Sequence, residues 1–281
     1  MHGYTNSGDT NSGDINSGGL ELGPQSLLWR FLGDRRYIAA LCRAFPLQML
    51  NPAIAAATME FSLVPKRIFV HKSRTIRCLI ESAYLTDFDS VRLIRYAHDT
   101  MSGQRPDGVR YHALNPEIFL FEHCTYVDAV FACVDAFHGG LDDDEREQLY
   151  QDTRAWYRIY GISARSLPAT YRDFTAYFAD ALATQTDPEP GMGAYGHQFL
   201  SPDYGPFKKV PSGVVRALQH PLAQHHLGIS PTDADRRALT RYGRRMSLAE
   251  KISPNRVIFP DSVREQVVAA RSRAKNLSTT T

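Results

Sequence analysis

The sequence has few cysteines, and their arrangement gives no disulfide framework. Its 281 residues include only Cys42, Cys78, Cys124 and Cys133, and no two of them form a Cys-x-x-Cys pair. Each lies in an apolar stretch of helical spacing, where a free cysteine behaves as a small hydrophobe. We therefore expect structural cysteines rather than a zinc site, and a cytoplasmic protein whose thiols stay reduced.

The sequence also lacks an excess of charge of one sign. It has 32 basic and 30 acidic residues, a net charge of +2, and no long block of like charge. The arginines near the C-terminus recur at helical spacing among acidic and apolar residues, which is typical of a solvated helix face. We therefore expect no nucleic-acid partner.

No hydrophobic run is long enough to suggest a membrane span. The longest apolar tract, residues 45–61, is interrupted by Gln48, Asn51, Pro52 and Glu60, so we expect no integral membrane segment. The N-terminus has neither the basic region nor the apolar core of a signal peptide. Residues 1–22 repeat Asn-Ser-Gly three times, and this low-complexity composition predicts a disordered tail.

The common hydrolase and nucleotide-binding motifs are missing as well. The sequence contains no His-Glu-x-x-His, no Gly-x-Ser-x-Gly and no P-loop, and the glycine-rich run 191–196 follows no predicted strand. His225 and His226 are adjacent and so diverge on a helix, which leaves at most a surface metal site with His220. Nothing in these motifs supports hydrolase or kinase chemistry.

What the sequence does contain is helical periodicity, while strand signals are scarce. From Leu27 onward the apolar residues recur at steps of three and four. The spacing predicts helices over residues 27–32, 35–50, 53–61, 75–85, 90–101, 116–138, 142–160, 171–183, 214–227, 231–246 and 261–275. We expect an all-α fold, a single multi-helix domain over residues 23–275 with a frayed tail at 276–281.

Caps and breaks refine this pattern. Asn51 and Asn115 each precede a proline, which predicts an N-cap followed by a helical first turn. Pro46 predicts a kink or break within the second helix. Residues 105–108 predict a turn, and the Pro- and Gly-rich residues 186–211 predict a long loop.

Two histidines fall on apolar helix faces, where an unpartnered imidazole is costly. Val91, Ile94, His98 and Met101 lie at steps of three and four, so His98 points where the apolar residues point. His123 occupies a similar position on the next helix. Each could be an axial metal ligand, or a core histidine bonded to a backbone carbonyl or to an acid such as Glu122. Spacing alone favours the core histidine in both cases.

Several segments resemble a known family in their order and spacing. They are Gly33-Asp34-Arg35-Arg36, Leu47-Gln48 with Pro52-Ala53-Ile54-Ala55, the helix at Thr75, Arg95-Tyr96-Ala97-His98-Asp99 with Met101 and Gly103, Pro106-Asp107-Gly108, Tyr111 with Ala113-Leu114-Asn115-Pro116-Glu117, Glu122-His123, and Gly161-Ile162 with Leu167-Pro168-Ala169-Thr170 and Phe174. Together they resemble the rubber-oxygenase catalytic domain family, which includes latex clearing protein and the mycophenolic-acid-pathway oxygenase. The resemblance covers roughly residues 33–182 well and the rest loosely.

The resemblance implies a somewhat globin-like helical fold that encloses an apolar pocket for haem b. It implies O₂-dependent oxidation of an apolar, often isoprenoid, substrate. The family's proximal histidine precedes a segment that matches Leu114-Asn115-Pro116-Glu117, so His98 is the expected iron ligand and His123 a residue of the haem pocket. Ile94 and Met101 would flank His98 in this pocket.

One departure concerns the distal side. Members of the family often show Arg-x-x-x-Thr on the helix before the proximal histidine. Thr75 fits the threonine, but His71 occupies the arginine position and the nearest arginine is Arg74. The resemblance therefore implies that Thr75 and Arg74 anchor the haem or polarise oxygen, with His71 as a candidate second axial ligand.

Two other function classes stay open at this point. One is a haem-dependent tailoring enzyme of a biosynthetic pathway that catalyses dehydrogenation, hydroxylation or cyclisation. The other is a non-catalytic helical protein that binds haem or a lipid.

Overall fold

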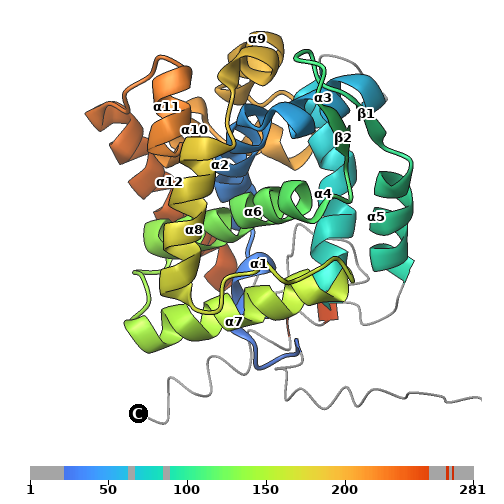
Figure 1. Cartoon of the computed structure of the whole chain (residues 1–281). Helices are drawn as coiled ribbons and strands as arrows, with labels where there is room; N and C mark the ends of the chain where they lie inside the picture. The colour runs from blue at the N-terminus through green and yellow to red at the C-terminus, as the bar shows by residue number, and fades with distance from the viewer. Residues whose placement is uncertain (1–21, 63–66, 85–88, 253–263, 266–267, 269–281) are drawn as a thin grey trace, which may run out of the picture.

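Helices make up nearly all the regular structure, as the periodicity predicts. The computed structural model describes residues 22–62, 67–84, 89–252, 264–265 and 268. In this part of the chain there are twelve α-helices, one short 3₁₀ helix, η1, and a single two-stranded hairpin at the edge of the molecule (Figure 1). The bounds are α1 Leu27–Leu32, α2 Tyr37–Leu50, α3 Pro52–Phe61, α4 Ile68–Tyr84, α5 Asp89–Asp99, β1 Ser102–Gln104, β2 Arg110–His112, α6 Pro116–Phe137, α7 Asp143–Ile159, α8 Tyr171–Thr184, α9 Pro188–Phe199, η1 Gly205–Lys209, α10 Ser212–Leu218, α11 Pro221–His226 and α12 Asp233–Ile252. The all-α prediction is confirmed.

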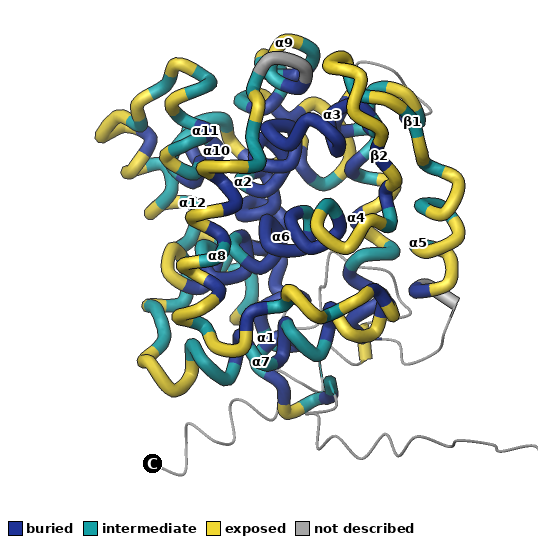
Figure 2. Tube along the Cα trace, viewed as in Figure 1, coloured by how far each residue is buried: buried dark blue, intermediate teal, exposed yellow. Residues whose placement is uncertain are grey.

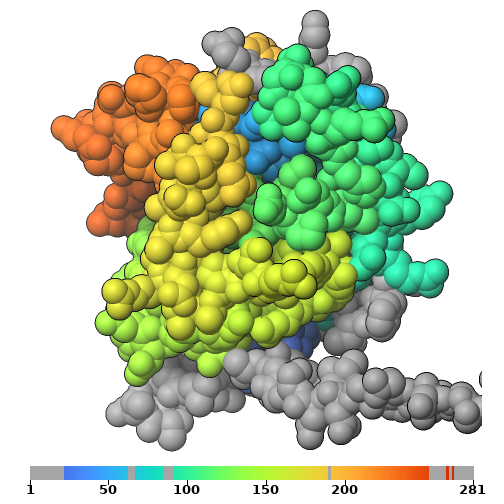
Figure 3. All heavy atoms as spheres, in the orientation of Figure 1, coloured from blue at the N-terminus to red at the C-terminus, as the bar shows by residue number. Residues whose placement is uncertain are grey.

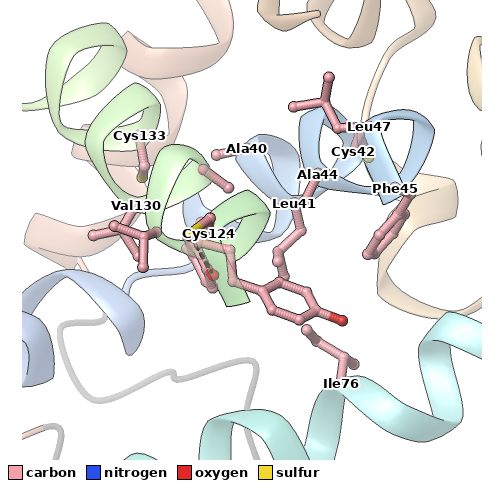
Figure 4. Packing of buried hydrophobic residues seen from close by; sticks show 14 of the residues in the cluster. Ala40, Leu41, Cys42, Ala44, Phe45, Leu47, Ile76, Cys124, Val130 and Cys133 are labelled. Atoms are coloured by element: carbon pink, nitrogen blue, oxygen red, sulfur yellow. Dashed lines mark hydrogen bonds between the residues drawn. The ribbon is translucent and has the colours of Figure 1, made fainter. Parts of the chain in front are cut away.

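The core is built on the contact between α2 and α6, which pack against each other through the middle of the molecule. Of the 14 residues of α2, only Arg43 is not fully buried, and Figure 2 shows both helices as the dark, buried centre. Leu41 of α2 lies between α6 and Ile76 of α4 (Figure 4). Phe45, one turn further along α2, packs edge-on against Phe69 of α4 and Phe207 of η1, with ring centroids at 6.0 and 5.2 Å. Burying this apolar surface is the main stabilising contribution to the fold.

The predicted caps form. The Asn51 side chain accepts hydrogen bonds from the backbone N–H groups of Ala53 and Ile54, and Asn115 caps α6 through the N–H of Glu117. Capping boxes at Asp142 and Thr170 start α7 and α8. These local bonds fix where the helices begin, and therefore which residues of α6 face which neighbour.

The long loop expected over residues 186–211 is wrong, because α9 and η1 occupy most of it. A helix that contains three glycines has low intrinsic propensity, so tertiary packing must supply its stability. A Cβ at Gly191 would lie 2.0 Å from the carbonyl oxygen of Met49. Only glycine lets α9 approach the backbone of α2 so closely.

Other boundaries also differ from the prediction. Helix α4 begins at Ile68 rather than near residue 75, since Ile68, Lys72 and Ile76 form one buried stripe in which the lysine hides the apolar pattern. Helix α2 runs through Pro46 without a break. The single helix expected over residues 214–227 is two, separated at Pro221, because proline cannot donate an intrahelical hydrogen bond. Helix α12 extends to Ile252.

The hairpin was not predicted, because its strands have only three residues each. It pairs β1 with β2 in antiparallel register, with Gly103 opposite Tyr111. The turn expected at residues 105–108 connects the strands, and Gly108 there has a φ of 85°. That positive φ explains why a glycine closes the turn.

Some predictions fall outside the described residues: the tail at 1–22 apart from its last residue, the tail at 276–281 and most of the helix at 261–275. All four cysteines are free. In the residues that the structure describes, no single helix has the length and apolarity to cross a membrane. Helices α2 and α3 meet that criterion only as a pair bent by 101°.

Candidate functional site

A cavity lies among α3, α4, α5, the hairpin and the N-terminal half of α6. The space between these elements, its open mouth included, has a volume of about 1070 Å³. Much of the wall is small or aliphatic, with alanines from α3 (Ala53 and Ala57), from α5 (Ala97) and from the turn after β2 (Ala113). The cavity exists because these short side chains leave unfilled the space between the helices.

Three contacts hold the outer wall of the cavity in place. Helix α5 packs on α4 at the edge of the molecule (Figure 1). Arg95 of α5 donates hydrogen bonds of 2.9 Å to the carbonyl oxygens of Tyr160 and Gly161, just past the end of α7. Tyr111 of β2 donates a 2.8 Å hydrogen bond to Glu60 of α3. The space-filling view shows this α5–hairpin wall on the side opposite the C-terminal helices (Figure 3).

His98, near the end of α5, lines the cavity and is half-buried. Its Nδ1 lies 2.7 Å from the carbonyl oxygen of Ile94, one turn earlier. A carbonyl oxygen can only accept, so Nδ1 carries a proton, and in the neutral ring Nε2 is the nitrogen that has the lone pair. No donor among the described residues is hydrogen-bonded to Nε2. A histidine held through Nδ1–H to a carbonyl, with Nε2 available, has the arrangement common in metal-ligating histidines.

His123 of α6 has a different environment, although it lines the same cavity. It is buried, and its Nε2 lies 3.2 Å from the carbonyl oxygen of Thr153, so here Nε2 donates. The rings of Trp156 and Tyr157 stand edge-on to it, with centroids at 5.0 and 5.1 Å. Burial lowers the pKa of His123 to about 3, so it is a neutral wall residue at neutral pH. Its partner is a carbonyl, one of the two alternatives for a core histidine.

His71 of α4 is a third imidazole at the cavity. Burial, followed by the charges of Lys72, His98 and Arg74, lowers its pKa to about 3, so it is also neutral. Thr75 lines the cavity from an exposed position, and its hydroxyl donates to the carbonyl oxygen of Lys72 at 3.3 Å.

Not all of the predicted site residues line the cavity. His98, His123, Thr75, Ile94 and Met101 do. The Arg74 side chain is exposed and is not part of the lining, although its charge acts on His71. The resemblance therefore predicted a set of residues of which all but one meet at a single cavity.

A polar corner that sequence reasoning missed completes the site. Lys72, only 3% exposed, donates a 2.5 Å hydrogen bond to the side-chain oxygen of Gln48, and its Nζ lies 3.8 Å from Glu122 Oε1. The Gln48 amide donates to the Thr125 hydroxyl at 2.8 Å, and the Tyr126 hydroxyl donates to Glu122 Oε1 at 3.3 Å. We call Lys72, Gln48, Thr125, Glu122 and Tyr126 the polar corner.

The available signal for the polar corner was a lysine on an apolar stripe, four residues from Ile68 and from Ile76. Such a lysine is costly to bury without a partner. Burial lowers the pKa of Lys72, and the nearby Glu122 opposes that effect. The sequence could not have named the partners, since Gln48 is 24 and Glu122 50 positions away.

The side chains at the cavity that could ligate a metal do not form a complete metal site by themselves. Within the described ranges, no group of three or more His, Cys, Asp or Glu side chains could hold a metal ion. What the cavity offers is the Nε2 atom of His98, to which no described donor is hydrogen-bonded, among largely apolar walls that also carry the His71 imidazole. This set could supply one protein ligand to a metal that brings its other ligands with it.

Comparison with known proteins gives one match. The family model described as ER-bound oxygenase mpaB/B'/Rubber oxygenase, catalytic domain, matches residues 29–248. Searches of curated proteins and of solved structures gave no match. The matched residues run from α1 almost to the end of α12 and include every residue that lines the cavity.

Proposed function

We propose, from the premise that this chain belongs to the family of ER-bound oxygenase mpaB/B' and rubber oxygenase catalytic domains, that it is a haem b-dependent oxygenase that acts with O₂ on a hydrophobic substrate. The observation that carries the proposal is the state of His98. Its Nδ1–H is engaged by the Ile94 carbonyl, so that Nε2 keeps its lone pair beside an apolar cavity.

The residues present fit a b-type haem. His98 would hold the iron through Nε2, and Ile94, Ala97 and Met101 would exclude water around it. Arg74 keeps a guanidinium near His71, where it could pair with a haem propionate. When bound, the haem would supply the activation of O₂, which side chains alone do not provide.

The other cavity residues position and protect the substrate. The alanines and Phe119 give an apolar surface that binds a hydrophobic chain without competing hydrogen bonds. His71 and His123, both neutral at neutral pH, bring no charge that would draw water into the cavity. The Thr75 hydroxyl lies at the exposed edge, where it can hydrogen-bond to a bound ligand.

Haem binding by a histidine variant tests the proposal. The protein is purified with haem supplied, and the Soret band is titrated in the wild type, in His98→Gly, and in His197→Ala, which changes an exposed histidine outside the cavity. We expect His98→Gly to weaken haem binding at least about tenfold, added imidazole to restore it, and His197→Ala to match the wild type. Unchanged stoichiometric haem in His98→Gly would remove His98 as the ligand.

Product analysis then separates oxygenase from tailoring chemistry. The loaded enzyme is incubated aerobically with isoprenoid candidates, and product masses are measured. Cleavage of a C=C bond gives two carbonyl fragments, hydroxylation adds one oxygen atom, and dehydrogenation removes two hydrogen atoms. Haem or lipid binding without any O₂ consumption across the candidates would instead support a non-catalytic binding protein.

A further inference from the structure

The polar corner is the feature of the cavity that the proposed function leaves unexplained. A buried ion pair is weak evidence for stability, because the cost of desolvating two charges offsets much of their attraction. Lys72, Gln48 and Thr125 are at most 3% exposed. The Glu122 side chain is 24% exposed and lines the cavity together with Lys72 and Tyr126. Among the five residues, the carboxylate of Glu122 is the one most open to a ligand.

The hydrogen-bond donors around Glu122 act on one oxygen. The Tyr126 hydroxyl and the Lys72 ammonium both lie against Oε1, at 3.3 and 3.8 Å. For Oε2 no donor is assigned among the described residues. A carboxylate has about four acceptor sites, so the polar corner presents a charged acceptor at the cavity that its described partners leave only partly used.

The charges already present in the polar corner limit which ligand head group the Glu122 carboxylate could bind. Lys72 and Glu122 together are neutral, so a ligand ammonium would leave one net positive charge among apolar walls. A ligand carboxylate or phosphate would lie against the Glu122 carboxylate, and the Lys72 ammonium already donates to Gln48 and balances the charge of Glu122 at 3.8 Å. A hydroxyl adds no charge and supplies the missing donor.

We propose that the Glu122 carboxylate, held in place by Lys72 and Tyr126, anchors the hydroxyl group of a substrate that is otherwise apolar, such as a long-chain or isoprenoid alcohol. The inference rests on the proposed function only in assigning the substrate to this cavity. Glu122 would be a specificity-determining residue. Lys72 would be a positioning residue that never meets the substrate's reacting atoms.

Ligand binding to the full-length, haem-supplied protein tests this assignment. Farnesol, farnesyl methyl ether, farnesoic acid and farnesylamine share one chain and differ at the head group. Their dissociation constants are measured by equilibrium dialysis without oxygen, so that no turnover occurs. Since a hydrogen bond to a charged acceptor is worth roughly ten- to hundredfold in binding, we expect farnesol to bind at least about tenfold more tightly than the ether. The acid and the amine should both bind more weakly than farnesol.

Three variants separate the anchor from a general effect on the cavity. In Glu122→Gln, the preference for farnesol over the ether should fall to roughly threefold or less, since a neutral acceptor is weaker. In the Lys72→Met/Glu122→Leu double variant, which leaves neither charge unpaired, the preference should vanish. Asp128→Asn removes a carboxylate of the same helix that pairs with Arg43 outside the cavity, and the preference should be unchanged.

The outcomes are decisive in both directions. For the wild type, the proposal is overturned if farnesol does not bind, if farnesol and its ether bind equally, or if the acid or the amine binds more tightly than farnesol. For the variants, it is overturned if both Glu122 variants keep the preference for farnesol over the ether. Haem binding is measured on the same samples. If the wild type binds no haem but still prefers farnesol, only the haem assignment is overturned. If the wild type binds haem but shows no preference for farnesol, only the alcohol anchor is overturned.

Discussion

The two halves of α6 have similar apolar sequences but contrasting surroundings. In the C-terminal half, Phe131 is enclosed by the rings of Tyr171 and Phe174, with centroids at 4.5 and 6.4 Å. In the N-terminal half, Phe119 borders the cavity, and its neighbours include the half-buried ring of His98 at 6.1 Å.

The difference comes from the facing elements rather than from α6. Helix α8 presents the rings of Tyr171 and Phe174, which fill the space beside Phe131. Phe119 meets the rings of Tyr157 and Tyr160 on one side, with centroids at 6.0 and 5.2 Å. On its other side lies the cavity, whose alanine-rich outer wall is fixed in place by Arg95 and by the Tyr111–Glu60 hydrogen bond. One half of the helix therefore contributes mostly stability, and the other half gives up packing for a binding site. Close packing and an open cavity are alternatives for the same length of helix.

The largest expected effect compares one substitution in both halves. Phe131→Ala should lower the free energy of unfolding by about 3–5 kcal/mol, because its rigid aromatic neighbours cannot collapse into the hole. Phe119→Ala enlarges a space that already exists and should cost about 1–2 kcal/mol. Urea denaturation followed by circular dichroism measures both. Equal losses would mean that the cavity half is as tightly packed as the other.

A glycine pair in α9 tests the packed side next. Gly191→Ala forces a methyl group against the Met49 carbonyl and should destabilise by about 1–3 kcal/mol or more. At Gly193 a Cβ would meet nothing within 4 Å, so Gly193→Ala should stabilise by up to about 1 kcal/mol through helix propensity alone. Melting curves of the two variants should therefore shift in opposite directions. A destabilised Gly193→Ala variant would contradict this assignment of α9.

The smallest expected effect concerns the neutral histidine between the two halves. Burial lowers the pKa of His123 to about 3, so between pH 6.5 and 3 the unfolded chain binds a proton that the folded chain does not. Stability from this residue is therefore complete above pH 6.5 and is lost as the pH falls. For one such histidine, unfolding should become easier by about 1.4 kcal/mol between pH 7.5 and pH 5.5.

His123→Leu should remove that share of the pH dependence, while His71 continues to contribute a similar loss. The variant also leaves the Thr153 carbonyl without its donor, but this cost is the same at both pH values. An identical pH dependence in His123→Leu and the wild type would show that His123 is not held neutral by burial.

Local signals predicted the helix starts well and the distant contacts poorly. The Asn51 and Asn115 caps formed because a cap depends on residues within three positions. Helix α9 was missed because its stability depends on the approach of Gly191 to Met49, far away in sequence. The start of α4 was missed because the partners of Lys72 lie on α2 and α6. The resemblance placed His98, His123 and Thr75 at one site, but no sequence pattern could reveal the polar corner.

By itself the sequence determined the helical character of the chain, the capped starts of its main helices and the family to which it belongs. These follow from periodicity, from side-chain bonds within one turn and from an ordered series of motifs. Only the tertiary structure decided that His98 lines a cavity with no described donor bonded to its Nε2, that His123 donates its Nε2 proton to the Thr153 carbonyl, and that Lys72 is buried beside Glu122. The reason is that hydrogen-bond partners and desolvation depend on which helices meet, and for these residues the deciding contacts come from the folded arrangement of the chain.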